Sequence, residues 1–216
     1  GYVEGSIGNY EMRRAQAVLN APLSDNLRIR LGVDHHKRSG YLNNIAYVPN
    51  TPLVGPKDFA DVNYTAARLS VVADLTSKLQ NYTIVSYSHS DTSGIVPKMV
   101  FAPSAGYRAA NYTAQVAALR ENFYDVSNGN PYAQQKIEQW QIINTTTWRA
   151  SDTITLKNII SYAQFRQRQA ASLFGDNGVT AGDPITYNQL VIPTPPPGKY
   201  NVAQSTFTEE LQLQGV

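Results

Sequence analysis

Alternation of apolar and polar side chains is the clearest pattern along the chain. In residues 27–34 every second side chain is apolar, and the residues between them are two arginines, a glycine and an aspartate. Successive side chains of a β-strand point to opposite faces, so this period of two predicts a strand with one apolar and one polar face. The same period predicts further strands at 62–75, 79–89, 137–149, 153–165 and from 206 onward.

The opening stretch, residues 2–21, is predicted as one long strand with a bend or bulge at Gly8 and Asn9. A hairpin that turns at these two residues is the alternative. The predicted strands number about seven and run for about ten to fourteen residues, longer than the roughly five or six usual in soluble sheets. We therefore expect an all-β, antiparallel fold with long strands.

The connections between these strands fall into two classes by length. Tight turns are predicted near 22–26, 76–78 and 150–152, and long loops near 39–60, 90–135 and 166–205. If residues 2–21 form one strand, an up-and-down meander places all tight turns at one end of the sheet and all long loops at the other. This asymmetry is typical of outer-membrane β-barrels, whereas unstructured loops beyond roughly 12 to 15 residues are uncommon in compact domains. Residues 114–123, within the second long loop, have helical periodicity and predict a short helix.

Composition narrows the class of protein. The 216 residues include 18 Lys and Arg against 16 Asp and Glu, and only 16% of all residues are charged. This balance argues against a protein that binds nucleic acid by neutralising phosphates. Cysteine is absent, which excludes disulfides, thiolate metal sites and a cysteine nucleophile. No run approaches the roughly 18 apolar residues of a membrane-spanning helix.

The sequence offers no motif for catalysis, a cofactor or a metal. His35 and His36 are adjacent on a strand and therefore point to opposite faces, and His89 is distant in the sequence. Glu209 and Glu210 are likewise adjacent, so they cannot converge on one bond as an acid/base pair must. The sequence contains no Gly-x-Ser-x-Gly nucleophile elbow, no Gly-x-x-x-x-Gly-Lys phosphate loop and no Rossmann glycine pattern. We predict no catalytic residue, although Glu209 shares the apolar phase of its strand, which alternation does not explain.

Three runs near the start of the chain carry a family resemblance: GYVEGSIGNY at 1–10, NAPLSDNLRIRL at 20–31 and KRSGY at 37–41. They resemble the first barrel strands of TonB-dependent outer-membrane receptors, where such strands follow the plug domain. The runs ARL at 67–69, DTITLKNIISY at 152–162 and FTEELQLQ at 207–214 are similar to later strands of the same family. The resemblance covers the strands from end to end and rests on the order and spacing of these motifs together.

This resemblance implies that residues 1–216 are a partial barrel domain, supplying about seven strands of an up-and-down transmembrane barrel of about 22. It implies an active transport receptor in the bacterial outer membrane, which takes up a scarce nutrient such as a ferric siderophore, cobalamin or an oligosaccharide. The expected partners are outer-membrane lipid, the small-molecule ligand and the TonB complex, which acts through a plug that the chain lacks.

Several polar residues are candidates for contact with the ligand. Lipid-facing arginine would cost roughly 2 to 4 kcal/mol near the midplane, so we expect polar side chains of the strands to face the lumen. The lumen-facing candidates for the ligand path are Arg28, Arg30, Asp34, Arg68 and Asp74. Tyr and Asn in the long loops offer stacking and hydrogen bonds, and the candidates there are Tyr107, Tyr112, Tyr124, Asn128, Asn130 and Tyr132.

Two other classes of protein remain open at this point. A soluble or secreted β-rich module that binds carbohydrate or acts as an adhesin has the same alternation, with its polar face in water. A β-sheet hydrolase is the third reading. The alternating run that is still continuous at Val216 favours a segment of a longer protein, which the receptor interpretation explains and the other two do not.

Overall fold

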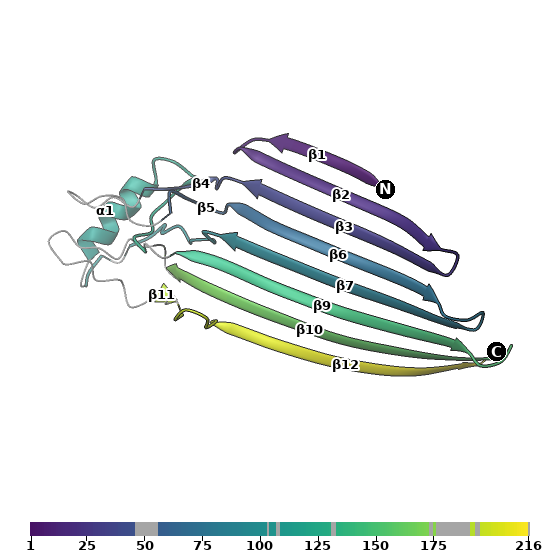
Figure 1. The fold of residues 1–216 in the computed structure, drawn as a ribbon. Coiled ribbons are helices and arrows are strands. Elements are labelled where there is room, and N and C mark those ends of the chain that lie inside the picture. The colour runs from purple at the N-terminus through teal and green to yellow at the C-terminus, as the bar shows by residue number, and fades with distance from the viewer. Residues whose placement is uncertain are drawn as a thin grey trace.

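The computed structural model describes residues 1–45, 56–102, 104–106, 109–130, 133–172, 175, 191–192 and 195–215. Their main feature is one antiparallel sheet whose long strands lie side by side in an elongated, single-layer array (Figure 1). In the described part of the chain the other sheet is a small one at one end of these strands. None of the described helices is both long enough and apolar enough to cross a membrane.

Eight long strands build the main sheet: β1 (Tyr2–Gly8), β2 (Met12–Ser24), β3 (Leu27–Arg38), β6 (Val62–Asp74), β7 (Leu79–Thr92), β9 (Gln134–Arg149), β10 (Ile154–Ser172) and β12 (Val202–Gly215). They follow one another across the sheet in chain order, and each pairs antiparallel with the next. A short strand, β11 (Val191–Ile192), pairs only with the end of β10. The sheet is open, with β1 and β12 at its edges, and the predicted all-β antiparallel meander is confirmed.

The prediction of a single strand over residues 2–21 is wrong, and the hairpin alternative is right. β1 and β2 form a hairpin whose turn contains Tyr10 and Glu11, with φ angles of 59° and 56°. Two consecutive residues with positive φ are typical of the β-turns that match the twist of a hairpin, and the Met12 N–H donates to the Asn9 carbonyl at 3.3 Å. Tyr and Glu seldom adopt this conformation, so the sequence does not reveal the turn.

This hairpin also corrects the predicted arrangement of connections. The sheet has eight long strands rather than seven, and the turn at residues 9–11 lies at the end that carries the long loops (Figure 1). The other three tight turns lie at the opposite end, as predicted. There, neighbouring hairpins are tied together, because the Asp74 N–H donates to the Asn26 carbonyl and the Arg149 N–H to the Lys78 carbonyl, each at 2.8 Å.

The described parts of the long loops fold into a small unit beyond the ends of the strands. A three-stranded sheet joins β5 (Asp58–Phe59), β4 (Leu42–Asn44) and β8 (Asp125–Val126), with β4 and β8 parallel. Its core consists of Phe59, Val96, Val126 and Ala133, with Leu42 packed against it. The helix α1 (Ala109–Leu119) confirms a loop helix, five residues earlier at its start than the sequence predicts.

Candidate functional site

The two faces of the main sheet differ in chemistry because the strand registers keep every second residue on the same side. Gln16 pairs with Asp34, Asp34 with Ala66, Ala66 with Ser88 and Ser88 with Gln139. Paired residues share a face, so this row crosses five strands on one side, which we call the polar face. A row of glutamine, serine and aspartate cannot form a dry core, which makes this face a candidate lining for an aqueous space.

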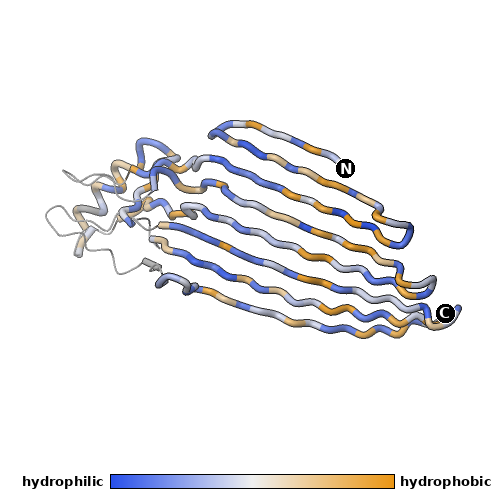
Figure 2. The backbone as a smooth tube through the Cα atoms, viewed as in Figure 1, coloured by the Kyte–Doolittle hydropathy of each residue, from blue (hydrophilic) through white to orange (hydrophobic). Residues whose placement is uncertain are grey.

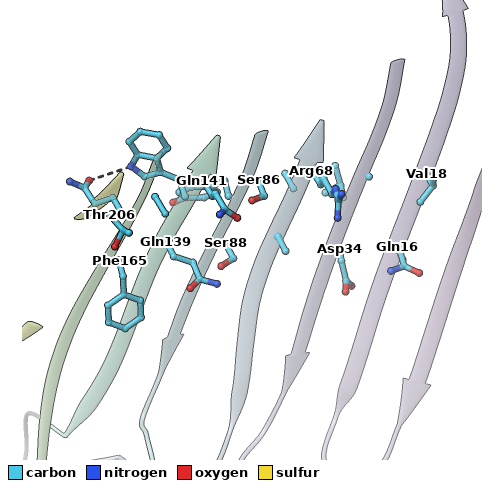
Figure 3. A pocket seen from close by; sticks show the side chains of 18 of the residues that line it. Gln16, Val18, Asp34, Arg68, Ser86, Ser88, Gln139, Gln141, Phe165 and Thr206 are labelled. Carbon is cyan, nitrogen blue, oxygen red and sulfur yellow. Dashed lines mark hydrogen bonds between the residues drawn. The ribbon is translucent and has the colours of Figure 1, made fainter. Parts of the chain in front are cut away.

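The polar face is hollowed at its centre. A hollow of about 590 Å³ is lined from β2, β3, β6, β7, β9, β10 and β12. Figure 3 shows Gln16, Asp34 and Arg68 on one side of it and Gln139 and Gln141 on the other. Sequence analysis did not single out the glutamines and serines of this lining, namely Gln16, Ser86, Ser88, Gln139 and Gln141. These residues occupy alternate strand positions on the same face as Asp34 and Arg68, so they can be identified once the strand register is known.

A bidentate ion pair braces the polar face near the long-loop end. Arg14 donates from Nε and Nη2 to the two carboxylate oxygens of Asp34, at 2.9 and 2.7 Å. The Tyr64 hydroxyl donates to the same carboxylate at 3.0 Å, and the ring of His36 meets the Tyr64 ring edge to face at 5.6 Å. These hydrogen bonds connect β2, β3 and β6, so the cluster stabilises the pairing of three strands.

A second ion pair lies near the tight turns. Arg28 Nη2 donates to Asp74 at 2.6 Å, and the Gln80 amide donates to the other oxygen of that carboxylate at 2.7 Å. All five predicted lumen-facing residues therefore lie on the polar face, three of them within the two ion pairs. Within the described residues Arg30 and Arg68 have no hydrogen bond or ion pair.

The opposite face of the sheet carries an apolar band. Figure 2 shows apolar residues concentrated toward the tight-turn half of the strands. Side chains of the band include Ile29, Leu31, Val33, Leu69, Val71, Val85, Tyr87, Trp140, Ile142, Trp148, Leu156, Ile160, Tyr162, Phe207, Leu211 and Leu213. Many are well exposed, for example Leu211 at 72%. The aliphatic rows thus have no second layer against them in the part of the chain that the structure describes.

Charged side chains replace the apolar ones on this face toward the long-loop end. Beyond Tyr87 and Trp140 the facing pairs are His89 with Glu138 and Asp91 with Lys136. The Lys136 Nζ lies 2.9 Å from the Asp91 carboxylate. The band therefore ends at a defined level of the strands. Within it, Glu209 is an exception that the structure explains in part, because its carboxylate accepts a hydrogen bond from the Asn158 amide at 3.3 Å.

The Tyr and Asn residues predicted to contact the ligand from the long loops differ in how exposed they are. Tyr124 is about half exposed, and its ring meets those of Tyr41 and Phe123 edge to face. Tyr112 lies on α1. Asn128 and Asn130 are buried, and the Asn128 side-chain oxygen accepts from the Asn130 N–H at 2.8 Å, so Asn128 serves the loop fold. Tyr107 and Tyr132 lie outside the described residues.

The described residues contain no group of three or more His, Asp or Glu side chains that could hold a metal ion. His35 and His36 lie on opposite faces, as predicted, and His35 Nδ1 is 2.9 Å from the Thr65 hydroxyl. What the arrangement offers chemically is a polar, partly cationic wall backed by an apolar surface.

Comparison with solved structures finds the ferric-catecholate import receptor Fiu from E. coli K12, in its closed form, with a TM-score of 0.55 and 16% sequence identity. The chain shares its fold with one stretch of that receptor. The matched region covers 97% of this chain but 26% of Fiu, so the chain spans about a quarter of the length of the receptor it resembles. No protein-family model and no curated protein matches the sequence.

Proposed function

We propose that the chain forms part of the barrel wall of a transport receptor in the bacterial outer membrane. The observation that carries this proposal is the exposed apolar band on one face of a sheet whose other face is polar. Lipid admits strands only when every backbone group is paired, and it requires apolar side chains outside and allows polar ones inside. A soluble module would expose the same aliphatic rows to water, which is unfavourable for a surface of this extent.

The height of the band supports this proposal. On β9 the band runs from Trp148 to Trp140, which is roughly 27 Å of strand. A strand tilt of about 40° reduces this to roughly 20 Å, close to the apolar band of about 25 Å on outer-membrane barrels. Aromatic residues at both limits match the girdles that flank such bands. The Tyr162 ring lies beside that of Trp140, with the two ring centroids 5.3 Å apart.

The cargo and the energy source belong to the proposal as well. The fold shared with an import receptor supports uptake of a scarce nutrient, such as a ferric siderophore, cobalamin or an oligosaccharide, driven by the TonB complex. The polar face would line the ligand path, and the loop unit at the ends of the strands would face the outside of the cell. The proposal contains no enzymatic step and no cofactor.

Cell fractionation of the full-length protein that contains this chain tests the proposal. We expect a tagged version to band with the outer membrane on a density gradient and to migrate differently on SDS gels before and after boiling. Uptake of a labelled ferric catecholate, cobalamin or oligosaccharide should depend on both the protein and TonB. Recovery of the protein in the soluble fraction would contradict the proposal.

A further inference from the structure

We propose that Arg30 and Arg68 form a binding site for one anionic group, a carboxylate or phosphate, of a small molecule that passes along the polar face. The inference rests on the proposed function and adds to it the chemistry of the cargo. It starts from a contrast among the cations of this face. Arg14 and Arg28 each hold a carboxylate, whereas the described residues offer none to Arg30 or Arg68.

The register places these two arginines next to each other. Arg30 on β3 pairs with Ser70 on β6, and Arg68 pairs with Gly32, so the arginines are diagonal neighbours on one face. Such neighbours are about 7 to 8 Å apart at the backbone, within reach of one anion for two flexible side chains. Two like charges at this spacing repel each other, and an anion between them removes that repulsion.

The space that an anion needs is present. A hollow of about 770 Å³ on the polar face is lined by both arginines, Gly32 and Ser70. A methyl group added at Gly32 would meet one neighbour, the Val18 side chain, at 3.8 Å. Glycine at this position therefore leaves open the space between Val18 and Arg68, which pair with Gly32 from β2 and from β6 and are both labelled in Figure 3.

The chemistry of the site favours an anion over a neutral group. A guanidinium presents several N–H donors in a plane, which suits the oxygen pairs of carboxylate and phosphate. Tyr82 and Asn20 line the same hollow, and both side chains carry a neutral hydrogen-bond donor. The nearest carboxylates of the face, Asp34 and Asp74, are already held by Arg14 and Arg28, so they do not compete for the site.

Arginine modification with phenylglyoxal tests the inference, with inorganic phosphate as the probe. The full-length protein in detergent is treated with and without phosphate, and mass spectrometry follows each arginine. We expect both Arg30 and Arg68 to react, and phosphate at about ten times its dissociation constant to slow both roughly tenfold. Arg13, on the opposite face of the same sheet, is the internal control and should not respond to phosphate.

Two variants sharpen the test. Arg68→Gln should remove the protection of Arg30, because one guanidinium alone holds the anion poorly. Gly32→Leu should leave both arginines reactive and abolish protection by filling the space. If phosphate slows neither arginine in the unmodified protein, the inference is wrong. If neither arginine reacts at all in the folded protein, a protein segment covers them, which also overturns it. Recovery of the same preparation from the outer membrane is scored separately, so a failure of the proposed function remains distinguishable.

Discussion

Asn81 on β7 and Asn144 on β9 are diagonal neighbours joined by reciprocal amide hydrogen bonds. Asn81 Nδ2 donates to Asn144 Oδ1 at 3.1 Å, and Asn144 Nδ2 donates to Asn81 Oδ1 at 3.0 Å. Each amide also donates to a hydroxyl, Asn81 to Thr146 at 2.9 Å and Asn144 to Thr83 at 2.7 Å. The two hydroxyls donate back, Thr83 to Asn81 and Thr146 to Asn144.

This group of four polar residues lies inside the apolar band, between Leu79 and Val85 on β7. Each side-chain N–H and O–H of the group has an acceptor within the group. In a lipid environment, where water does not satisfy polar groups, such internal pairing lets the four residues lie on an otherwise apolar surface. The network also links β7 to β9 across this part of the sheet.

Breaking this network from one side should destabilise the sheet. Asn144→Leu leaves the Asn81 amide without its main partner, and we expect the free energy of unfolding to fall by roughly 1 to 3 kcal/mol. The double variant Asn81→Leu/Asn144→Leu should lose less than the sum of the two single variants, because both partners are then apolar. Urea unfolding of the full-length protein in lipid vesicles measures the free energy of unfolding of the two single variants and the double variant. Strict additivity would contradict the coupling.

Adjacent residues on β7 give a matched test of which face meets lipid. Val85 lies on the apolar face and Ser86 on the polar face. Val85→Arg should cost roughly 2 to 4 kcal/mol if that position lies near the bilayer midplane, whereas Ser86→Arg should cost much less. Unfolding in vesicles and the yield of heat-modifiable protein in the outer membrane are the measurements. A larger loss for Ser86→Arg would reverse the assignment of faces.

The loop unit should depend on one buried asparagine. Asn44 Nδ2 donates to the carbonyls of Pro56 and Asn128, at 2.8 and 3.1 Å, and its Oδ1 accepts from the Asn128 N–H at 2.9 Å. Asn44→Ala leaves these buried groups unpaired, at a cost of roughly 1 to 3 kcal/mol. We expect faster proteolysis in residues 39–45 and 120–130, with the strands unaffected.

The neighbouring Asn43→Ala is the control for this loop variant. Its amide makes one exposed hydrogen bond to Asp125, at 3.1 Å, and an exposed bond of this kind contributes little. Equal proteolysis rates for the Asn43 and Asn44 variants would show that the buried amide is not what holds the loops.

Asp61, which lies beyond the band and directly before β6, should make the loop region sensitive to pH. Burial raises the pKa of its carboxyl, although the carboxylate accepts the Ser93 N–H at 2.8 Å. The folded state then binds the proton more tightly than the unfolded state, so stability is greatest below the ordinary Asp pKa. It falls as the pH rises through the raised value in the folded protein.

Asp61→Asn should remove this dependence, because the amide oxygen still accepts the Ser93 N–H without a charge to desolvate. Hydrogen exchange at the Ser93 amide, corrected for its intrinsic pH dependence, measures local opening in both proteins. We expect the protection of Ser93 to decline with rising pH in the unmodified protein and to stay level in the variant. The same decline in both would exclude Asp61 as its cause.

The tight-turn ends of the strands from β3 to β10 and the identity of the two faces follow from the sequence, whereas β10 runs to Ser172, seven residues beyond its predicted end. The predicted strand at 62–75 is β6 at Val62–Asp74. The sequence places Arg68 and Leu69 on opposite faces of this strand, and the structure does the same. The reason is physical, because side chains of a strand alternate with a period of two and apolar residues collect on one side whatever the neighbouring strand is. The faces of the sheet therefore needed no tertiary contact to be predicted.

What only the tertiary structure decided is which residues meet across strands. The turn at Tyr10 and Glu11 cannot be predicted from local preferences, because both residues have positive φ angles that Tyr and Glu seldom adopt. Pairing of β1 with β2 stabilises them in this conformation. The same holds for the reciprocal Asn81 and Asn144 amides, the burial of Asn128, and the absence of a carboxylate beside Arg30 and Arg68 in the described chain. Each depends on register between segments far apart in the sequence, and register is set by many backbone hydrogen bonds acting together rather than by any local run of residues.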